Sequence, residues 1–462
     1  MNLTASDIAA TLILISLPLM LSAQPSGAED DTLLQALTQL SALEESRSNT
    51  DLQLAEPLLQ LAEEYRQRGR FADAHAALDR GMQIVQINSG LYTPEQLPYL
   101  EKKIENFADW LDWDSARELL EHLMWLHRTK TRLIDEELLE NLMQVSRYHL
   151  RGISQDSLEY QTYHFRRALS SNWLAVSAAE RLWSTTDKRL VPMLYSLIKQ
   201  YHLQAVAIDR GGRTGYELRQ IVPGTDWVRE RSEMRMYYYD MGQRILSQLD
   251  GIYETADTAD QEGLAMIHLY RADWQMMFSR DEEALESYQL AFEGLSAAGN
   301  PTELINQFFS SPTLLPENEF HDTLNKAVTS RSARPSMASI SDQQLESTLY
   351  FAEWSASFPY VRSPYRQQDS GNVDSGFALF SLSLSGMTEM TRWLSPRSVL
   401  EFGELLDATL LKPSGTELGN QQELRQRLEW LHFRPRMVDG HPEETSATLL
   451  YQPAPRPRLV GL

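Results

Sequence analysis

Apolar residues recur at spacings of three and four positions from residue 29 to about residue 300, and this period constrains the chain more than any other feature. Leu, Ala, Glu, Gln and Arg dominate the stretch, and long segments within it contain neither Gly nor Pro. Such a period places one apolar stripe of a helix against a core. We therefore expect residues 29–300 to be mainly α-helical.

The clearest unit within this stretch is a helical hairpin over residues 58–84, which read LLQLAEEYRQRGRFADAHAALDRGMQI. Gly69 supplies a tight turn, and small residues on both helices let them approach closely. The spacing resembles the tetratricopeptide repeat, a helical hairpin of about 34 residues. The residues that match the family pattern are Leu61, Ala62, Tyr65, Gly69, Phe71, Ala74 and Leu78, with Gly81 in place of a final Ala. The resemblance implies a repeat array whose concave face binds peptides or helices.

Two weaker copies of the second helix of this hairpin occur further along the chain. Their residues are Trp113, Ala116, Leu120 and Leu123 in one copy and Ala284, Tyr288 and Ala291 in the other. The turn at residues 279–281 lacks Gly, and the distances between copies are irregular. We expect a degenerate array of tetratricopeptide-like hairpins, and generic amphipathic hairpins are the alternative.

The N-terminus has the pattern of a secretory signal peptide. The apolar run Ile8–Ala23 has 16 residues, fewer than the roughly 20 of a membrane-spanning helix. Ser26-Gly27-Ala28 fits a small-x-small cleavage site. We expect residues 1–28 to be removed and the protein to be periplasmic, or secreted, in a bacterium. No Lys or Arg precedes Arg47, so an uncleaved anchor and a buried first helix are the alternatives.

The composition changes after residue 300. Residues 301–341 are rich in Pro, Ser and Thr, which predicts a linker. We expect residues 342–455 to form a small α+β domain, because strand patterns flank helix starts there. Residues 456–462 are expected to be a short tail. The expected strands lie within 345–358, 376–390 and 446–451, and the expected helices begin at Ser395, extending to about Leu411, and at Asn420.

The last 90 or so residues carry a second resemblance, to the C-terminal domain of TonB-type proteins. That family shows a strand closing on Gly, a helix entering an aromatic-x-Pro segment, a Gly turn and a last strand. The matching residues here are Gly376, Gly386, Trp430, Phe433, Pro435, Gly440 and Tyr451. TonB's membrane anchor and Pro-rich spanning segment have no counterpart. The resemblance implies a binding or packing module.

Composition and motif spacing favour a protein without catalytic chemistry. The net charge of -22 argues against a nucleic-acid partner, whose phosphates require a basic surface. The absence of Cys excludes disulfides and thiolate metal sites. The ten His residues lack metal-binding spacing, and the S-x-x-K match at Ser196–Lys199 lacks its partner motifs. We expect no enzyme activity, no metal and no cofactor. An enzyme with a site assembled from scattered residues is the minor alternative.

The sequence offers two candidate binding elements for protein or peptide partners in the cell envelope. One is Tyr237-Tyr238-Tyr239, where helical geometry leaves at least one ring exposed as a possible anchor. The other is the strand Ser446, Ala447, Thr448, Leu449, Leu450 and Tyr451, whose lack of charge and Pro suits pairing with an extended peptide. If residues 345–358 cover that strand, it is structural only. We expect a non-enzymatic exported scaffold without a membrane span after cleavage. The alternative is a coupling protein whose TonB-like domain engages an outer-membrane partner.

Overall fold

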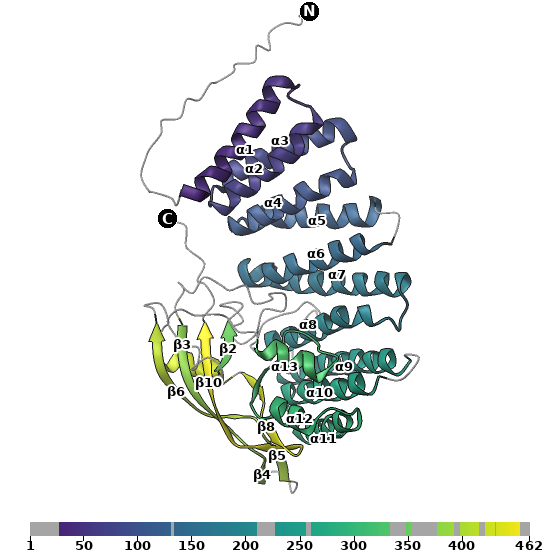
Figure 1. Cartoon of the computed structure of the whole chain (residues 1–462), viewed down its shortest axis with the longest axis vertical. Coiled ribbons are helices and arrows are strands. Elements are labelled where there is room, and N and C mark those ends of the chain that lie inside the picture. The colour runs from purple at the N-terminus through teal and green to yellow at the C-terminus, as the bar shows by residue number, and fades with distance from the viewer. Residues whose placement is uncertain are drawn as a thin grey trace, which may run out of the picture. The chain divides into compact units, whose positions relative to one another are not determined.

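The computed structural model describes residues 27–130, 134–209, 227–255, 260–332, 348–352, 377–391, 398–414, 421–429 and 431–452. The chain divides into two compact units, Met1–Trp110 and Leu111–Leu462, here called the first and second units. The fold is mainly α, followed by a small C-terminal α+β region, which confirms the predicted fold class (Figure 1). The predicted signal peptide and tail lie outside the described residues, apart from the last two positions of the former.

The described helices of the first unit are α1 (Gly27–Ser46), α2 (Ala55–Gln67), α3 (Phe71–Ser89) and α4 (Leu97–Asp109). Short 3-10 turns at Leu52–Leu54 and Pro94–Gln96 lead into α2 and α4. In the first of these turns, the Asp51 side chain accepts a hydrogen bond from the backbone N–H of Gln53. This contact satisfies a donor that the turn itself leaves unpaired.

The hairpin of α2 and α3 has the predicted helix phase. The predicted inward faces of both helices are buried. They are formed by Leu61 and Ala62 of α2 and by Ala74 and Leu78 of α3. Gly69 has a φ of 70°, which glycine adopts without steric cost. The backbone N–H of Gly69 donates to Arg66 O at 2.9 Å, and that of Arg70 donates to Tyr65 O at 2.9 Å. These bonds satisfy carbonyls at the end of α2, as in a glycine-terminated helix.

We expect Ala74→Leu to lower the free energy of unfolding of the first unit by about 1–3 kcal/mol, because Ala74 is fully buried and extra methyl groups overpack the site. Asp73→Ala is the matched control, since the Asp73 side chain is 51% exposed and pairs with the surface residue Arg70. Denaturant unfolding measures both variants. Equal losses for the two substitutions would contradict this packing.

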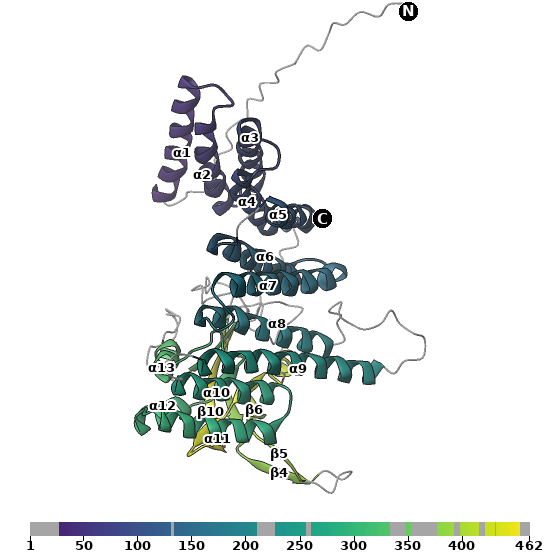
Figure 2. The same ribbon diagram turned by 90° about the vertical axis from the view of Figure 1, so that its right-hand side faces the viewer.

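Helices α5 to α11 of the second unit stack in chain order, and α12 and α13 lie beside this stack, as Figure 2 shows. They are α5 (Trp113–Lys130), α6 (Glu136–Gln155), α7 (Gln161–Leu182), α8 (Val191–Asp209), α9 (Trp227–Glu254), α10 (Gln261–Met277), α11 (Asp281–Ala297), α12 (Thr302–Phe309) and α13 (Leu324–Ser332). The closest neighbours are consecutive pairs, namely α6 with α7, α8 with α9 and α10 with α11. One large core runs from α6 to α13.

The turn between α10 and α11 has the same geometry as the Gly69 turn without a glycine. Ser279 occupies the position with a φ of 58°, and the Arg280 N–H donates to Gln275 O at 2.9 Å. Ala284, Tyr288 and Ala291 are all fully buried on α11. The residues of the third predicted copy therefore face a core, while the tetratricopeptide assignment itself stays a prediction.

The C-terminal region contains a four-stranded sheet in the order β2 (Thr348–Ala352), β10 (Thr445–Gln452), β3 (Phe377–Leu384) and β6 (Leu405–Ser414). β2 and β10 are parallel, and the other neighbouring pairs are antiparallel. Helix α15 (Gln421–Leu428) contributes Leu424 and Leu428 to the core that covers one face. The predicted alternation in β3 is confirmed, since Phe380, Leu382 and Leu384 are buried and the Ser residues between them are half-buried.

Three two-stranded ladders complete the described part of this region. They are β1 (Thr313–Leu315) with β7 (His432–Arg434), β4 (Thr388–Thr391) with β5 (Ser398–Glu401), and β8 (Arg436–Val438) with β9 (His441–Glu443). The prediction of a helix from Ser395 to about Leu411 is wrong. β5 and β6 occupy its described part, because pairing with β4 and β3 outweighs the local helix-start signal of Ser395-Pro396.

The predicted linker at 301–341 also differs from the structure over its described part. Residues 302–332 carry α12, β1 and α13, and Leu314, Leu315 and Leu324 are buried. β1 pairs with β7, so this segment connects the helices of the second unit to its strands. The Pro and Ser residues of this segment therefore lie within and between short ordered elements, and the segment is not a flexible spacer.

Candidate protein-binding surface

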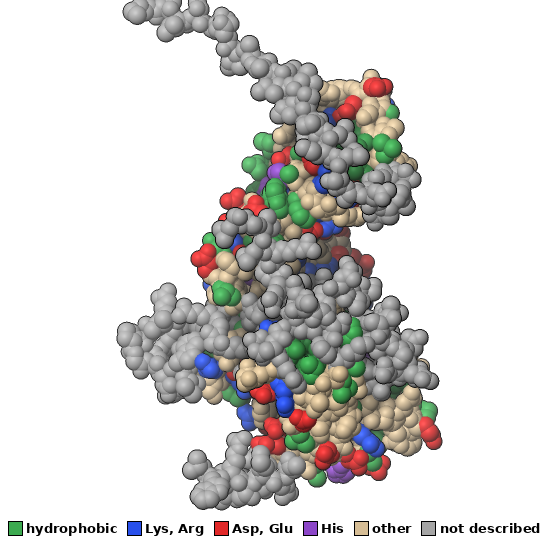
Figure 3. All heavy atoms as spheres, turned by 90° about the vertical axis from the view of Figure 1, so that its left-hand side faces the viewer, with side chains coloured by type: hydrophobic (Ala, Val, Ile, Leu, Met, Phe, Trp, Pro, Cys, Tyr) green, Lys and Arg blue, Asp and Glu red, His purple; other side chains and the backbone are tan. Residues whose placement is uncertain are grey.

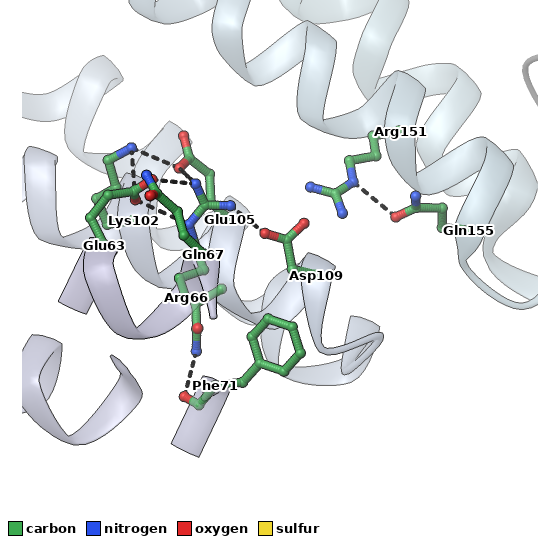
Figure 4. Close-up of polar contacts among 10 residues, drawn as sticks. Glu63, Arg66, Gln67, Phe71, Lys102, Glu105, Asp109, Arg151 and Gln155 are labelled. Carbon is green, nitrogen blue, oxygen red and sulfur yellow. Dashed lines mark hydrogen bonds and ion pairs between the residues drawn. The ribbon is translucent and has the colours of Figure 1, made fainter. Parts of the chain in front are cut away.

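A network of ion pairs joins α2 and α4 in the first unit, and Figure 4 shows its side chains converging on Arg66. The Arg66 guanidinium donates to both carboxylate oxygens of Glu63, at 3.0 and 2.6 Å. It also bonds to the Asp109 carboxylate and lies 3.8 Å from that of Glu105. One cation on α2 thus holds a carboxylate of its own helix and two of the neighbouring helix.

Lys102 and Gln67 extend this network. The Lys102 ammonium lies 2.8 Å from a Glu105 oxygen and 3.5 Å from a Glu63 oxygen. The Gln67 amide donates to Glu63 at 3.0 Å. The hydrogen bond from Arg66 outweighs partial burial and lowers the pKa of Glu63 to about 2. Glu63 is therefore fully ionised at neutral pH, and its contribution to stability is lost only as the pH falls from about 4.5 towards 2.

We call the surface formed by Glu63, Arg66, Gln67, Lys102, Glu105 and Asp109 the α2–α4 network. Its charged side chains are between 21 and 35% exposed, so solvent reaches groups whose positions are fixed by several bonds. Three carboxylates face two cations, which leaves an excess of negative charge. Such a surface can accept hydrogen bonds from a cationic or amide side chain without reorganising.

The structure separates the three consecutive tyrosines of α9. The Tyr237 ring is 44% exposed, while Tyr238 is fully buried and Tyr239 is 8% exposed. The Tyr239 hydroxyl donates to Glu283 at 2.7 Å, which ties α9 to α11. One exposed and two core rings agree with the helical geometry expected, and a binding role for Tyr237 stays a prediction.

The prediction that Ser446–Tyr451 forms a free strand edge is wrong. These residues lie in β10, which pairs with β3 from Thr445 to Tyr451 and with β2 from Thr448 to Gln452. Both backbone edges are therefore occupied over residues 448–451. Part of the segment 345–358 covers the strand, which is the structural alternative considered for it.

A buried ion cluster joins the C-terminal strands to the helices, and no local sequence pattern predicts it. Arg434 of β7 is 1% exposed and donates through Nε to Asp273 Oδ1 of α10 at 2.8 Å. Its Nη2 donates to Asp273 Oδ2 and, at 2.7 Å, to Glu317 after β1. The Tyr288 hydroxyl donates to Asp273 at 2.7 Å. Burial alone would lower the pKa of Arg434, but Asp273 and Glu317 raise it well above its ordinary value.

Buried histidines form a second internal group, at α6 and α7. The Nδ1 atoms of His149 and His164 lie 3.1 Å apart, and His164 Nε2 lies 2.9 Å from Asp156, which also pairs with Arg117. An Nδ1–Nδ1 hydrogen bond requires one donor and one acceptor, so at least one of the two rings is neutral. Burial lowers the pKa of both histidines.

Within the described ranges, no three His, Asp or Glu side chains gather into a set suited to a metal ion. In the same ranges, no helix is both long and apolar enough to cross a membrane. Comparison with protein-family models and with curated proteins gives no match for this chain.

Proposed function

We propose that this protein is a non-enzymatic scaffold that binds protein or peptide partners through its helical hairpins, with the small β-containing region as an accessory module. The observation that carries the proposal is the α2–α4 network, a solvent-accessible set of charges held in place by their mutual bonds. Fixed hydrogen-bonding groups reduce the entropy lost on binding and are typical of recognition surfaces. Stacked hairpins support it further, because such stacks offer long surfaces to extended partners.

The chemistry of the surface suggests the partner. The carboxylates of Glu63, Glu105 and Asp109 outnumber the local cations, and the whole chain carries a net charge of -22. Complementary charge speeds encounter and suppresses like-charged competitors. We therefore expect a peptide segment carrying Lys or Arg.

The test starts from peptides selected from a random library on the full-length protein, whose affinities are then measured by fluorescence anisotropy. Glu105→Gln keeps the side-chain shape but removes one acceptor charge, and we expect about a tenfold loss of affinity, the value of one charge-assisted hydrogen bond. Asp73→Asn removes a charge from the surface of α3, outside the network, and is expected to bind as the wild type does. Failure to select any basic peptide, or equal affinities for the two variants, would contradict the proposal.

We further propose that the protein is exported, with cleavage after Ala28. The proposal rests on the apolar run Ile8–Ala23 and the small residues that follow it. N-terminal sequencing of the protein from envelope fractions should give Glu29 as the first residue. An intact Met1 on protein from the cytoplasm would show that this proposal is wrong.

A further inference from the structure

β6 forms one edge of the four-stranded sheet. β3 pairs with it on one side, and no strand in the described part of the chain pairs with its other side. In Figure 1, β6 is the outermost arrow of the sheet. Figure 3 views the molecule from this side, where hydrophobic side chains reach the surface among acidic and basic ones. An edge strand offers unpaired N–H and C=O groups to another strand.

Two β-bulges shape this edge. The register between β3 and β6 passes from Leu384↔Leu405 to Ser383↔Asp407, so Leu406 is an extra residue on β6. It shifts again between Phe380↔Leu410 and Leu379↔Lys412, which makes Leu411 the second extra residue. Leu406 is 58% exposed and Leu411 is 55% exposed. Edges that avoid association commonly carry Lys, Pro or bulges. β6 has Lys412 and Pro413 near its end, whereas its two bulge positions hold leucine.

The sequence of the edge is nearly palindromic. Residues 405–411 read LLDATLL, so the same residue types lie at equal distances on either side of Ala408, apart from Asp407 and Thr409. When two antiparallel strands are related by a two-fold axis perpendicular to the sheet, residues equidistant from the axis face each other. With the axis at Ala408, Leu405 faces Leu411 and Leu406 faces Leu410 of the other strand.

We propose that a second copy of this chain pairs with β6 in this register, which joins two four-stranded sheets into one continuous sheet. The pairing satisfies the free backbone groups of both edges and removes the exposed Leu406 and Leu411 of each strand from water. Asp407 faces Thr409 of the other strand, and no two like charges lie directly opposite each other. The Thr409 hydroxyl already donates to Asp407 of its own chain at 2.9 Å. Each Asp407 is already neutralised by Arg425 of its own chain at 2.8 Å, so the pairing does not bring two uncompensated carboxylates together.

The surface is independent of the α2–α4 network, and so is its test. Sedimentation equilibrium of the full-length protein should give a concentration-dependent monomer–dimer equilibrium. Leu406→Lys should shift it to monomer, because the ammonium would face Leu410 of the second copy. Leu290→Lys, which changes a leucine of α11 that is 49% exposed, should leave it unchanged. A monomer at every concentration would overturn the proposal and leave an extended peptide as the occupant. A dimer that persists in Leu406→Lys would overturn it as well.

The register has its own test, since the chain contains no Cys. Asp407 and Thr409 face each other across the two-fold axis, with Cβ atoms about 4.5–5.5 Å apart. A variant with both Asp407→Cys and Thr409→Cys should form a disulfide-linked dimer under mild oxidation. Each single variant should not, because its two copies lie on a diagonal of about 7–8 Å, beyond the usual reach of a disulfide. Equal cross-linking of single and double variants would show that the register is wrong.

Discussion

Arg434→Met is expected to lower the free energy of unfolding of the second unit by about 3–5 kcal/mol, the cost of leaving buried charges without their partner. The substitution removes the cation that pairs with both Asp273 and Glu317, which are 2% and 7% exposed. One or both carboxylates must then take up a proton or admit water. Met fills most of the volume of the Arg stem, so the loss reflects charge rather than a cavity.

The control for Arg434→Met is Arg425→Met. Arg425 pairs with Asp407 at 2.8 Å, but both side chains are about half exposed, at 49% and 55%. Exposed pairs contribute about 0–1 kcal/mol. Denaturant unfolding followed by circular dichroism gives the free energies, and amide exchange shows whether α10 and β7 lose protection together. A small effect of Arg434→Met, similar to that of Arg425→Met, would contradict the role assigned to the cluster.

The same cluster bears on whether residues 342–455, the α+β domain predicted from the sequence, can fold alone. A fragment with these bounds retains Arg434 but lacks Asp273 and Glu317, and it also lacks β1, the partner of β7. Its core would keep α15 and the four-stranded sheet but expose a strand edge and an unpaired buried cation. These contacts favour folding of the strands together with α10 and β1.

Local patterns in the sequence predicted the helices well. The phase of α2 and α3 follows from apolar spacing within a single helix, and the buried residues Ala62 and Ala74 lie where that spacing places them. The strand β3 was equally predictable, because Ser and apolar residues alternate along it. In each case the information lies within about ten residues of the chain.

Pairings between distant segments were not predictable in this way. β10 has the composition of an edge, but its second neighbour is β2, about a hundred residues earlier in the chain. The Arg434–Asp273 pair joins residues 161 positions apart, and the Arg66–Asp109 pair of the candidate site joins residues 43 apart. No periodicity links such residues, so single-sequence reasoning identifies them as ordinary charged residues of a helix or strand.

The second large effect concerns acid, and a pair of buried histidines contributes to it. The rings of His202 on α8 and His432 on β7 lie with their centroids 6.2 Å apart. Burial, together with the positive charge of Arg235, lowers the pKa of His202 to about 3 and that of His432 to about 4. Both rings are therefore neutral in the folded protein between pH 7 and pH 5.

We expect the free energy of unfolding of the second unit to fall steeply between pH 7 and pH 5. The unfolded chain takes up a proton on each histidine near pH 6.5, whereas the folded chain does not until about pH 3–4, so falling pH favours the unfolded state. Each of the two histidines contributes a loss of about 2 kcal/mol over this range. Asp281 acts in the opposite direction, because burial and the nearby Glu404 and Glu401 raise its pKa to about 7.

The double variant His202→Leu, His432→Leu isolates the histidine contribution from that of Asp281. His202 packs against the rings of Trp274 and Phe278, so an apolar side chain of similar size suits its site. We expect the double variant to lose about 4 kcal/mol less than the wild type between pH 7 and pH 5. Denaturant titrations at the two pH values give this difference, and His441→Leu, at an exposed position of β9, serves as the control. If the double variant and the wild type lose the same free energy, the two rings are not held neutral by burial and the acid sensitivity has another source.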